Sequence, residues 1–332
     1  MNQKPVLVSG IKPTGDLHVG SYFGAMRQQV ELFRSGKYRC FIFVADYHAL
    51  NTMQDAEGMR QRTRELVMAY LAVGLDPKEV MLFKQSDVPA HTELAWIFDT
   101  ITTMPYLMRA HAFKDAEAKS KEIGVGTFNY PMLMAADILL YDTSVVPVGQ
   151  DQKQHIEIAR DTAEKFNRVY KQEIFKLPEP YIMPEVAVVP GTDGRKMSKS
   201  YGNVIPLFGT RDEIAKAVMS IVTDSSGGRP ENVYQIHKLL RSENELTTIY
   251  GSNIGNYKAL KEALTEDLDR YIAPMREKYE ELKKDSSIVE TVLAQGKVAA
   301  RAASEAKMEK VREAIGVAPT SGVGAPTGSV GA

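Results

Sequence analysis

A short basic segment of the sequence has the residue types that could clamp a polyphosphate. It consists of Lys196, Met197, Ser198, Lys199 and Ser200, and it follows the turn-forming residues 190–194. Two lysines on a loop can neutralise phosphate charge, although a basic stretch is more often a solvated surface run. The pentapeptide alone could also arise by chance. It therefore gains weight only if a second phosphate-binding segment accompanies it.

A second segment, residues 12–21, lies between an expected strand and an expected helix. The first turn of a helix presents unpaired N–H groups and a positive dipole to anions. Gly20 would let the backbone approach a phosphate closely, and His18 and Thr14 could donate hydrogen bonds. An ordinary capping or surface histidine is the simpler interpretation of His18 unless the lysine segment lies nearby.

A third segment, residues 130–141, places an acid among apolar residues. Tyr130, Met134, Asp137 and Tyr141 recur at helical spacing, so they are predicted to share one face of a helix. A carboxylate buried there needs a hydrogen-bond donor. Asp137 could cap a helix or pair with a lysine, but it could equally accept the N–H of an indole ring.

These segments fall within an alternating pattern of strands and helices. Short apolar runs predict strands at 5–9, 40–44, 80–83 and 144–148, and helical periodicity is found from Leu17 to Phe33 and at 55–73, 130–141 and 152–166. Such alternation predicts an α/β fold with a doubly wound parallel sheet extending to about residue 205. Ligands of these sheets bind at the carboxyl ends of strands, which points to the loops after residues 9, 44 and 148.

The second part of the chain has a different pattern. Amphipathic segments near 212–222, 233–249, 256–285 and 286–315 predict an all-helical domain without strands. The last residues are rich in glycine, proline, serine and threonine, which predicts a disordered tail. The expected division is therefore residues 1–205, 206–316 and 317–332.

Composition excludes several classes of protein. A net charge of −1 over 332 residues argues against indiscriminate coating of nucleic acid, which needs many cations. A single cysteine cannot supply a structural zinc or iron–sulfur site, and no apolar run is long enough to span a membrane. No secretory signal is visible at the start of the sequence, so a cytoplasmic location is expected.

Taken together, His18–Ser21 and Lys196–Ser200 resemble the paired HIGH and KMSKS signatures of class I aminoacyl-tRNA synthetases. Residues 130–141 and 146–155 are further similar to segments of the bacterial tryptophanyl-tRNA synthetases, and the similarity runs from Pro5 to about Val317. This resemblance implies a Rossmann-like catalytic domain that forms an aminoacyl-adenylate from tryptophan and ATP with Mg²⁺. Phosphoryl transfer of this kind depends on positioning and charge, without a protein nucleophile.

The resemblance also implies roles for individual residues. His18, Lys196 and Lys199 would be catalytic. The expected ATP contacts are Lys12, Pro13, Thr14, Gly20, Ser21, Gly149, Gln150, Asp151, Val188 and residues 196–200 (Lys196, Met197, Ser198, Lys199, Ser200). The expected tryptophan pocket comprises His48, Tyr130, Met134, Asp137, Val146, Val148 and Gln152. The bacterial family more often has Gln at Lys12, Thr-Ile-Gly-Asn at 18–21 and Glu at Gln150, so charge around ATP is redistributed here.

Three alternatives can be weighed against this interpretation. A tyrosine-specific enzyme of the same fold usually has Tyr in place of Val8 and Gln in place of Met134, and this chain has neither polar group. A small-molecule nucleotidyltransferase would have no need for a helical tRNA-binding domain. A non-catalytic paralogue would have no need for His18, Lys196 and Lys199. The expected partners are tRNA(Trp), L-tryptophan, ATP and a second copy of the chain in a homodimer, with no membrane.

Overall fold

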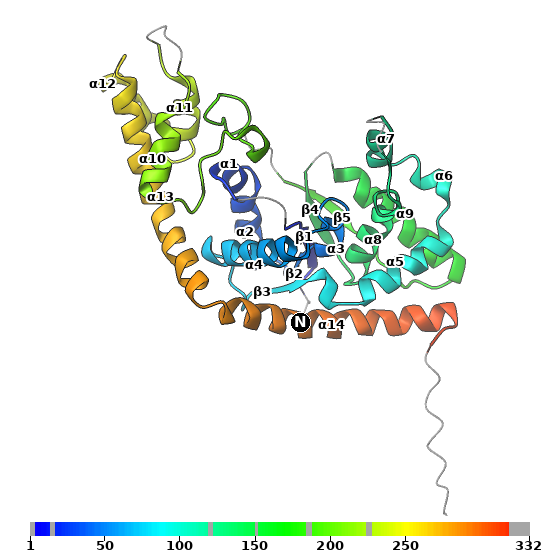
Figure 1. Cartoon of the computed structure of the whole chain (residues 1–332). Helices are drawn as coiled ribbons and strands as arrows, with labels where there is room; N and C mark the ends of the chain where they lie inside the picture. The colour runs from blue at the N-terminus through cyan, green and yellow to red at the C-terminus, as the bar shows by residue number, and fades with distance from the viewer. Residues whose placement is uncertain are drawn as a thin grey trace, which may run out of the picture.

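The computed structural model describes residues 4–13, 17–118, 122–149, 152–183, 188–223 and 228–318. Its centre is a five-stranded parallel sheet in the order β3-β2-β1-β4-β5 (Figure 1). The strands are β1 (Val6–Ile11), β2 (Arg39–Val44), β3 (Val80–Lys84), β4 (Val145–Val148) and β5 (Glu179–Ile182). The predicted α/β fold class is thus confirmed. The order reverses between β1 and β4, and this reversal is where such sheets usually bind ligands.

Alternate residues of the strands enter two separate cores, one on each face of the sheet. In β2, Cys40, Ile42 and Val44 belong to one buried cluster, whereas Phe41 and Phe43 belong to the other. This alternation follows from the two-residue side-chain period of a strand. A sheet buried on both faces explains why the strand at 40–44 is an uninterrupted apolar run.

The helices before residue 205 flank this sheet. They are α1 (Val19–Ser21), the π-helical turn η1 (Tyr22–Met26), α2 (Arg27–Phe33), α3 (Asp46–Ala49), α4 (Ala56–Ala72), the 3₁₀ turn η2 (Gln85–Asp87), α5 (Ala90–Ile101), α6 (Met104–Leu107), α7 (His111–Ala118), α8 (Val125–Leu139) and α9 (Lys153–Tyr170). The predicted helix from Leu17 to Phe33 is present from Val19, with a π-helical turn inside it. Sequence analysis did not predict α3, α5, α6, α7 or β5.

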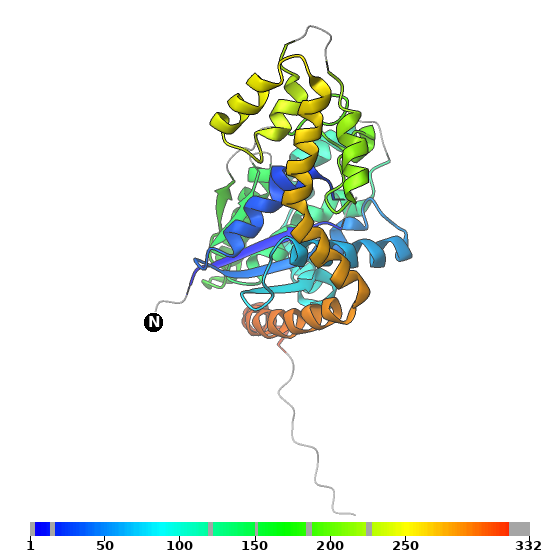
Figure 2. The same ribbon diagram turned by 90° about the vertical axis from the view of Figure 1, so that its left-hand side faces the viewer.

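Beyond residue 205, the described residues form helices and no named strand, as expected. These helices are α10 (Arg211–Met219), α11 (Glu231–His237), α12 (Glu243–Ser252), α13 (Tyr257–Lys284) and α14 (Ser287–Ile315). A 3₁₀ turn, η4 (Lys199–Tyr201), lies just before residue 205. Helices α10 to α12 gather around one end of α13, on one side of the sheet (Figures 1 and 2). The predicted segment 233–249 is two helices, α11 and α12.

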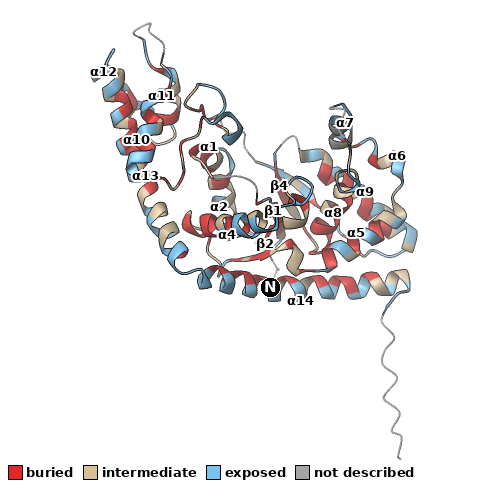
Figure 3. Cartoon of the chain, in the orientation of Figure 1, coloured by how far each residue is buried: buried red, intermediate tan, exposed pale blue. Residues whose placement is uncertain are grey.

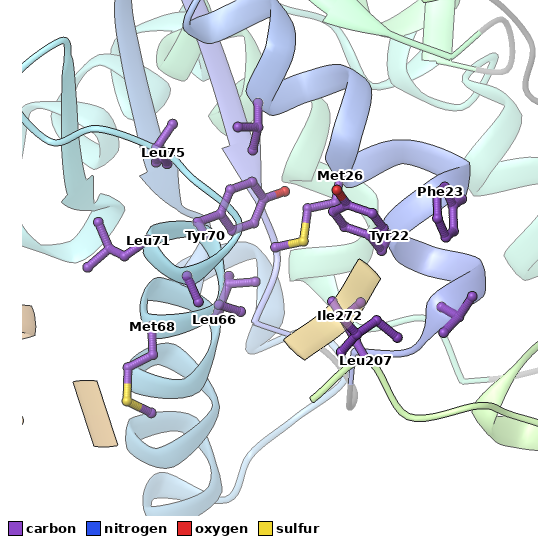
Figure 4. Close-up of a cluster of buried hydrophobic side chains, with 14 of the residues drawn as sticks. Tyr22, Phe23, Met26, Leu66, Met68, Tyr70, Leu71, Leu75, Leu207 and Ile272 are labelled. Carbon is purple, nitrogen blue, oxygen red and sulfur yellow. The ribbon is translucent and has the colours of Figure 1, made fainter. Parts of the chain in front are cut away.

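The long helix α13 is joined to the sheet region by a large apolar cluster. Ile272 of α13 packs in the same cluster as Met26 of η1, Leu66 of α4 and Leu207 (Figure 4). Tyr22 and Tyr271 share a hydrogen bond with 3.0 Å between their hydroxyl oxygens. Continuous packing therefore connects α13 to the helical segment that His18 caps and that contains Gly20.

The last helix, α14, returns to the sheet and covers its β3 edge (Figure 1). Val289, Val292 and Leu293 at its start belong to the core on one face, whereas Ala300, Met308 and Val311 belong to the core on the other. Figure 3 shows the buried residues of α14 recurring along its length. Covering an edge strand removes a site where another chain could pair. Among the described residues no helix is long and apolar enough to cross a membrane.

Gly296 lies where α14 crosses from one face to the other. A Cβ atom at this position would stand 1.9 Å from the backbone oxygen of Leu82 in β3. We expect Gly296→Ala to lower the free energy of unfolding by about 3 kcal/mol, because the helix must move off the edge strand. Denaturant unfolding of the purified variant measures this loss.

The matched control is Gly251→Ala near the end of α12. A Cβ at Gly251 meets no atom within 4 Å, and alanine is the better helix former. This variant is expected to be as stable as the wild type or slightly more so. Equal stability of the two variants would contradict the close approach of α14 to β3.

Candidate active site

A cavity of about 160 Å³ lies at the carboxyl ends of the strands, beside the reversal of strand order. Its walls come from β1, β2, β4, α3 and α8. They are formed by Val8, Gly10, Lys12, Phe43, Ala45, His48, Tyr130, Met134, Asp137, Ile138, Val146 and Gln152. The walls are largely apolar, with a few polar groups that converge from different elements, and this is the usual character of a small-molecule site.

Asp137 is the acid among the residues that line this cavity; it is buried, and three side chains donate to its carboxylate. The Nε2 atom of His48 lies 2.8 Å from Oδ2, and the Nδ1 atom of His91 lies 2.7 Å from Oδ1. The amide nitrogen of Gln85 lies 2.8 Å from Oδ1 and 3.0 Å from Oδ2. The buried charge is therefore fully hydrogen-bonded, as a stable buried carboxylate requires.

These contacts determine the protonation of Asp137. Burial alone would raise the pKa of Asp137, but the hydrogen bonds from His48 and His91 outweigh it and lower this pKa to about 2. Asp137 is consequently an anion at neutral pH. An anion that faces an apolar cavity can accept a hydrogen bond from a ligand N–H.

The lowered pKa of Asp137 makes a prediction about acid stability. Because the folded-state pKa lies below the unfolded value of ~3.9, the ionised group stabilises the fold above that value, and this contribution is lost as the pH falls towards 2. We expect the difference in unfolding free energy between wild type and Asp137→Asn to shrink by about 2 kcal/mol between about pH 5 and pH 2. Urea unfolding at several pH values measures it. A difference independent of pH would contradict the assignment.

Two loops that follow neighbouring strands are tied together next to Asp137. Asp46 begins α3 after β2, and its Oδ1 atom accepts from the backbone N–H of Ser86 in η2 at 3.0 Å. The Ser86 hydroxyl also donates to Asp46. This link fixes the position of His48 relative to Gln85, so donors from two loops meet at one carboxylate.

Sequence analysis missed Gln85 and His91. Both follow β3, and loops were sought only after residues 9, 44 and 148. The available signal was their place just beyond the carboxyl end of the buried strand at 80–83. His91 is also connected outward, because its Nε2 atom lies 2.9 Å from the hydroxyl oxygen of Tyr141.

The segment around His18 forms a capped helix start. The Nδ1 atom of His18 accepts from the backbone N–H of Ser21 at 3.2 Å, and the Ser21 hydroxyl pairs with the His18 backbone. Burial lowers the pKa of His18, so the ring is neutral and carries its proton on Nε2. That N–H can donate to a phosphate oxygen, which makes His18 both a cap and a candidate phosphate ligand.

The lysine segment is anchored directly on this helix start. The buried Met197 places its sulfur 3.1 Å from the backbone nitrogen of Gly20, and a Cβ on Gly20 would lie 2.9 Å from the Met197 Cβ. Gly20 is thus required for the two segments to meet. Lys196 and Lys199 on either side of Met197 are exposed. The structure therefore brings together the two segments that sequence analysis singled out.

Asn203 holds the shape of the lysine loop and was also missed. Its side-chain amide donates to Asp193 Oδ1 at 2.6 Å and to the Lys196 carbonyl at 3.1 Å, and its Oδ1 accepts from the Ser198 backbone at 2.7 Å. Asn203 is buried, so these bonds are protected from water. A lone asparagine downstream of the motif gives no recognisable sequence signal.

The remaining predicted residues divide into three groups. Six of the expected tryptophan-pocket residues line the cavity, and Val148 is buried on β4 without lining it. Lys12 lines the same cavity, Pro13 is buried and Gly149 is exposed at the end of β4, whereas Val188 is 63% exposed. Thr14, Gln150 and Asp151 lie outside the described residues, as do residues 319–332 of the expected tail. No cluster of His, Cys, Asp or Glu suited to a metal ion occurs in the described part of the chain.

Comparison with known proteins agrees with this geometry. The profile of the family described as "tRNA synthetases class I (W and Y)" matches residues 1–294. The chain is 46% identical to a tryptophan–tRNA ligase of Fusobacterium nucleatum over 93% of this chain and 97% of that protein. It therefore belongs to the tryptophanyl-tRNA synthetases.

Solved structures give the same result. The chain resembles the tryptophanyl-tRNA synthetase of Campylobacter jejuni complexed with ADP and tryptophan, with a TM-score of 0.86 and 43% identity over 93% of this chain and 99% of that one. A tyrosyl-tRNA synthetase of Archaeoglobus fulgidus, complexed with L-tyrosine, shares the fold with a TM-score of 0.62 at 20% identity, covering 84% of this chain and 90% of that one.

Proposed function

We propose that the protein is a tryptophan–tRNA ligase whose cavity binds L-tryptophan and whose lysine loop and His18 helix bind MgATP. A carboxylate oxygen of tryptophan attacks the α-phosphorus of ATP, the bond to the bridging oxygen breaks, and pyrophosphate leaves with the magnesium. A ribose hydroxyl at the 3′ end of tRNA(Trp) then attacks the carbonyl carbon, and AMP leaves. The reaction takes place in the cytoplasm, where its substrates are found.

One observation carries this proposal: the buried anion of Asp137 faces an apolar cavity. Val8 and Met134 line that cavity, and neither offers a hydrogen bond to a phenol. Asp137 accepts the indole N–H, and Lys12, which lines the same cavity, balances the negative charge of the substrate carboxylate or of the α-phosphate. A tyrosine hydroxyl could donate to Asp137, but it would find none of the further polar partners that a tyrosine-specific site has at the positions of Val8 and Met134.

The phosphate groups are bound by the two anchored segments. Lys196 and Lys199 neutralise the charge that develops on the leaving pyrophosphate, while the Nε2–H group of His18 donates to a phosphate oxygen. Magnesium enters with ATP as part of the substrate. The helical domain at 206–316 reads the anticodon end of the tRNA.

Charging of transfer RNA tests the overall function. Purified protein is incubated with labelled tryptophan, ATP and a tRNA(Trp) transcript, and acid-precipitable label is counted. We expect charging that requires ATP. Charging of tRNA(Tyr) with tyrosine instead would contradict the proposal, and so would the absence of any charging.

We further propose that the protein acts as a homodimer, through a face on α5 and α6. Trp96 on α5 is 70% exposed, and Met104 and Met108 at the two ends of α6, the next helix of the chain, are exposed as well. Large exposed apolar side chains at one end of a molecule are typical of a contact surface. A second copy covering them would remove this apolar surface from water.

Charge at this face should dissociate the dimer. We expect Trp96→Glu to raise the dimer dissociation constant by about 100-fold, since buried tryptophans often dominate interfaces. Sedimentation velocity at several concentrations measures this constant. Trp96 is also the only tryptophan of the sequence, so a change in its fluorescence as the wild-type protein is diluted directly follows dissociation of the dimer.

Val298→Glu on α14 provides the matched control. Val298 is also 70% exposed but lies on a different helix. Its substitution should leave the dissociation constant unchanged. Equal effects of the two substitutions, or a wild-type protein that is monomeric at micromolar concentration, would contradict the proposed face.

A further inference from the structure

All acceptor positions of the Asp137 carboxylate are filled in this structure. A carboxylate has about four lone-pair sites, two on each oxygen. Oδ1 accepts from His91 and Gln85, and Oδ2 accepts from His48 and Gln85. An indole N–H can therefore bind at full strength only if one of these donors leaves.

The three donors differ in their access to the cavity. His48 lines the cavity, whereas Gln85 and His91 are fully buried and do not line it. A substrate approaching through the cavity meets His48 first. The bond between His48 and Oδ2 is thus the one that a ligand can replace.

Gln85 and His91 are held from behind. The residue after Gln85 is Ser86, which Asp46 binds through both its backbone and its hydroxyl. The ring of His91 accepts from Tyr141 at 2.9 Å and stacks against Phe83, with ring centroids 6.2 Å apart and an interplanar angle of 29°. These contacts hold the backbone next to Gln85 and the ring of His91, and both side chains are fully buried.

We infer that Gln85 and His91 are positioning residues that fix the direction of the Asp137 carboxylate, and that His48 is an exchangeable donor whose place the indole N–H takes. This inference rests on the proposed recognition of tryptophan by Asp137. The fixed direction of the carboxylate explains why Asp137 can select a ligand that carries an N–H group. A carboxylate held on two sides presents one lone pair to the cavity, whereas a free one could rotate and accept from water.

The inference predicts how selectivity depends on the two buried donors. The measured quantity is the ratio of kcat/KM in ATP–pyrophosphate exchange for tryptophan over β-(3-benzothienyl)alanine, in which sulfur replaces the indole N–H. We expect a wild-type ratio of about 10 to 100, the effect of one hydrogen bond to a charged acceptor. A wild-type ratio near one would contradict the proposed function itself and not merely this inference.

Variants of Gln85 and His91 test whether positioning of the Asp137 carboxylate controls its hydrogen bond to the indole N–H. Gln85→Leu and His91→Leu should each reduce the ratio to within about threefold of one. His91→Asn keeps a donor near the position of Nδ1 and should restore most of the ratio. Gln61→Leu, the same change on the exposed face of α4, is the control and should keep the wild-type ratio. Folded Gln85→Leu and His91→Leu variants with the wild-type ratio would overturn the inference.

A second measurement needs no substitution. The chain has six histidines, and ¹⁵N labelling resolves their ring nitrogens. On titration with tryptophan, the signals of His48 should shift because its bond to Asp137 is replaced, while those of His91 should stay in place. A shift of His91 with an unchanged His48 would overturn the inference even if the leucine variants failed to fold.

Discussion

Asp137→Ala should lower kcat/KM for tryptophan in ATP–pyrophosphate exchange by about 10³-fold. The substitution removes the acceptor of the indole N–H, which is worth ~1.5–3 kcal/mol for a charged partner. It also leaves the donors on Gln85, His91 and His48 without an acceptor inside the protein. Both effects weaken binding of the substrate in the transition state.

The same experiment includes its controls. Asp212→Ala removes an exposed acid from the first turn of α10 and should leave the exchange rate unchanged. Melting curves of Asp137→Ala show whether the variant is folded at the assay temperature. A folded Asp137→Ala variant within a few-fold of wild-type kcat/KM would show that the acid is only structural.

Removing the charges of the lysine loop should affect chemistry rather than tryptophan binding. We expect the double variant Lys196→Ala/Lys199→Ala to reduce the rate of adenylate formation by about 10²- to 10³-fold, the usual cost of losing charge stabilisation in a transition state. Affinity for tryptophan without ATP should change little, because neither lysine lines the cavity. Single-turnover adenylate formation and equilibrium dialysis measure the two quantities separately.

Lys216→Ala on α10 is the control for this experiment, since Lys216 is exposed and lies outside the loop. It should retain the wild-type rate of adenylate formation. A double variant that forms adenylate at the wild-type rate, or that loses tryptophan affinity to the same extent as its rate, would contradict the assigned role of the lysines.

Much of the sheet could be predicted because its strands are short apolar runs bounded by turn residues. The run at 40–44 is buried on both faces, and its composition alone indicates a central strand. The π-helical turn at Tyr22–Met26 could not be predicted, since periodicity does not distinguish it from an α-helix. The short edge strand β5 is largely exposed and lacks an apolar run.

The position of α14 depends on long-range packing. Its sequence predicts an amphipathic helix, but only the structure shows that Gly296 crosses the edge of β3 and that both faces of the sheet share this helix. A glycine within a helix signals close approach without naming the partner. Residues near the end of the chain thus complete the core around the strands near its start.

The candidate site was only partly predictable for a similar reason. Asp137 could be singled out because it is an acid among apolar residues. The resemblance of residues 130–141 to the family implied that it accepts the indole N–H. Gln85 and His91 act on it from 52 and 46 residues away, in η2 and at the start of α5, a segment in which the sequence shows no motif. Contacts of this kind arise from the order of strands in the sheet.

The most direct test of the account is ATP–pyrophosphate exchange by the wild-type protein with tryptophan, tyrosine or phenylalanine as the amino acid. The account predicts exchange with tryptophan and a kcat/KM for tyrosine and phenylalanine lower by at least about 10³-fold. Comparable exchange with tyrosine would contradict the assignment of the cavity around Asp137, and no exchange with any of the three would contradict the assignment of an adenylate-forming site.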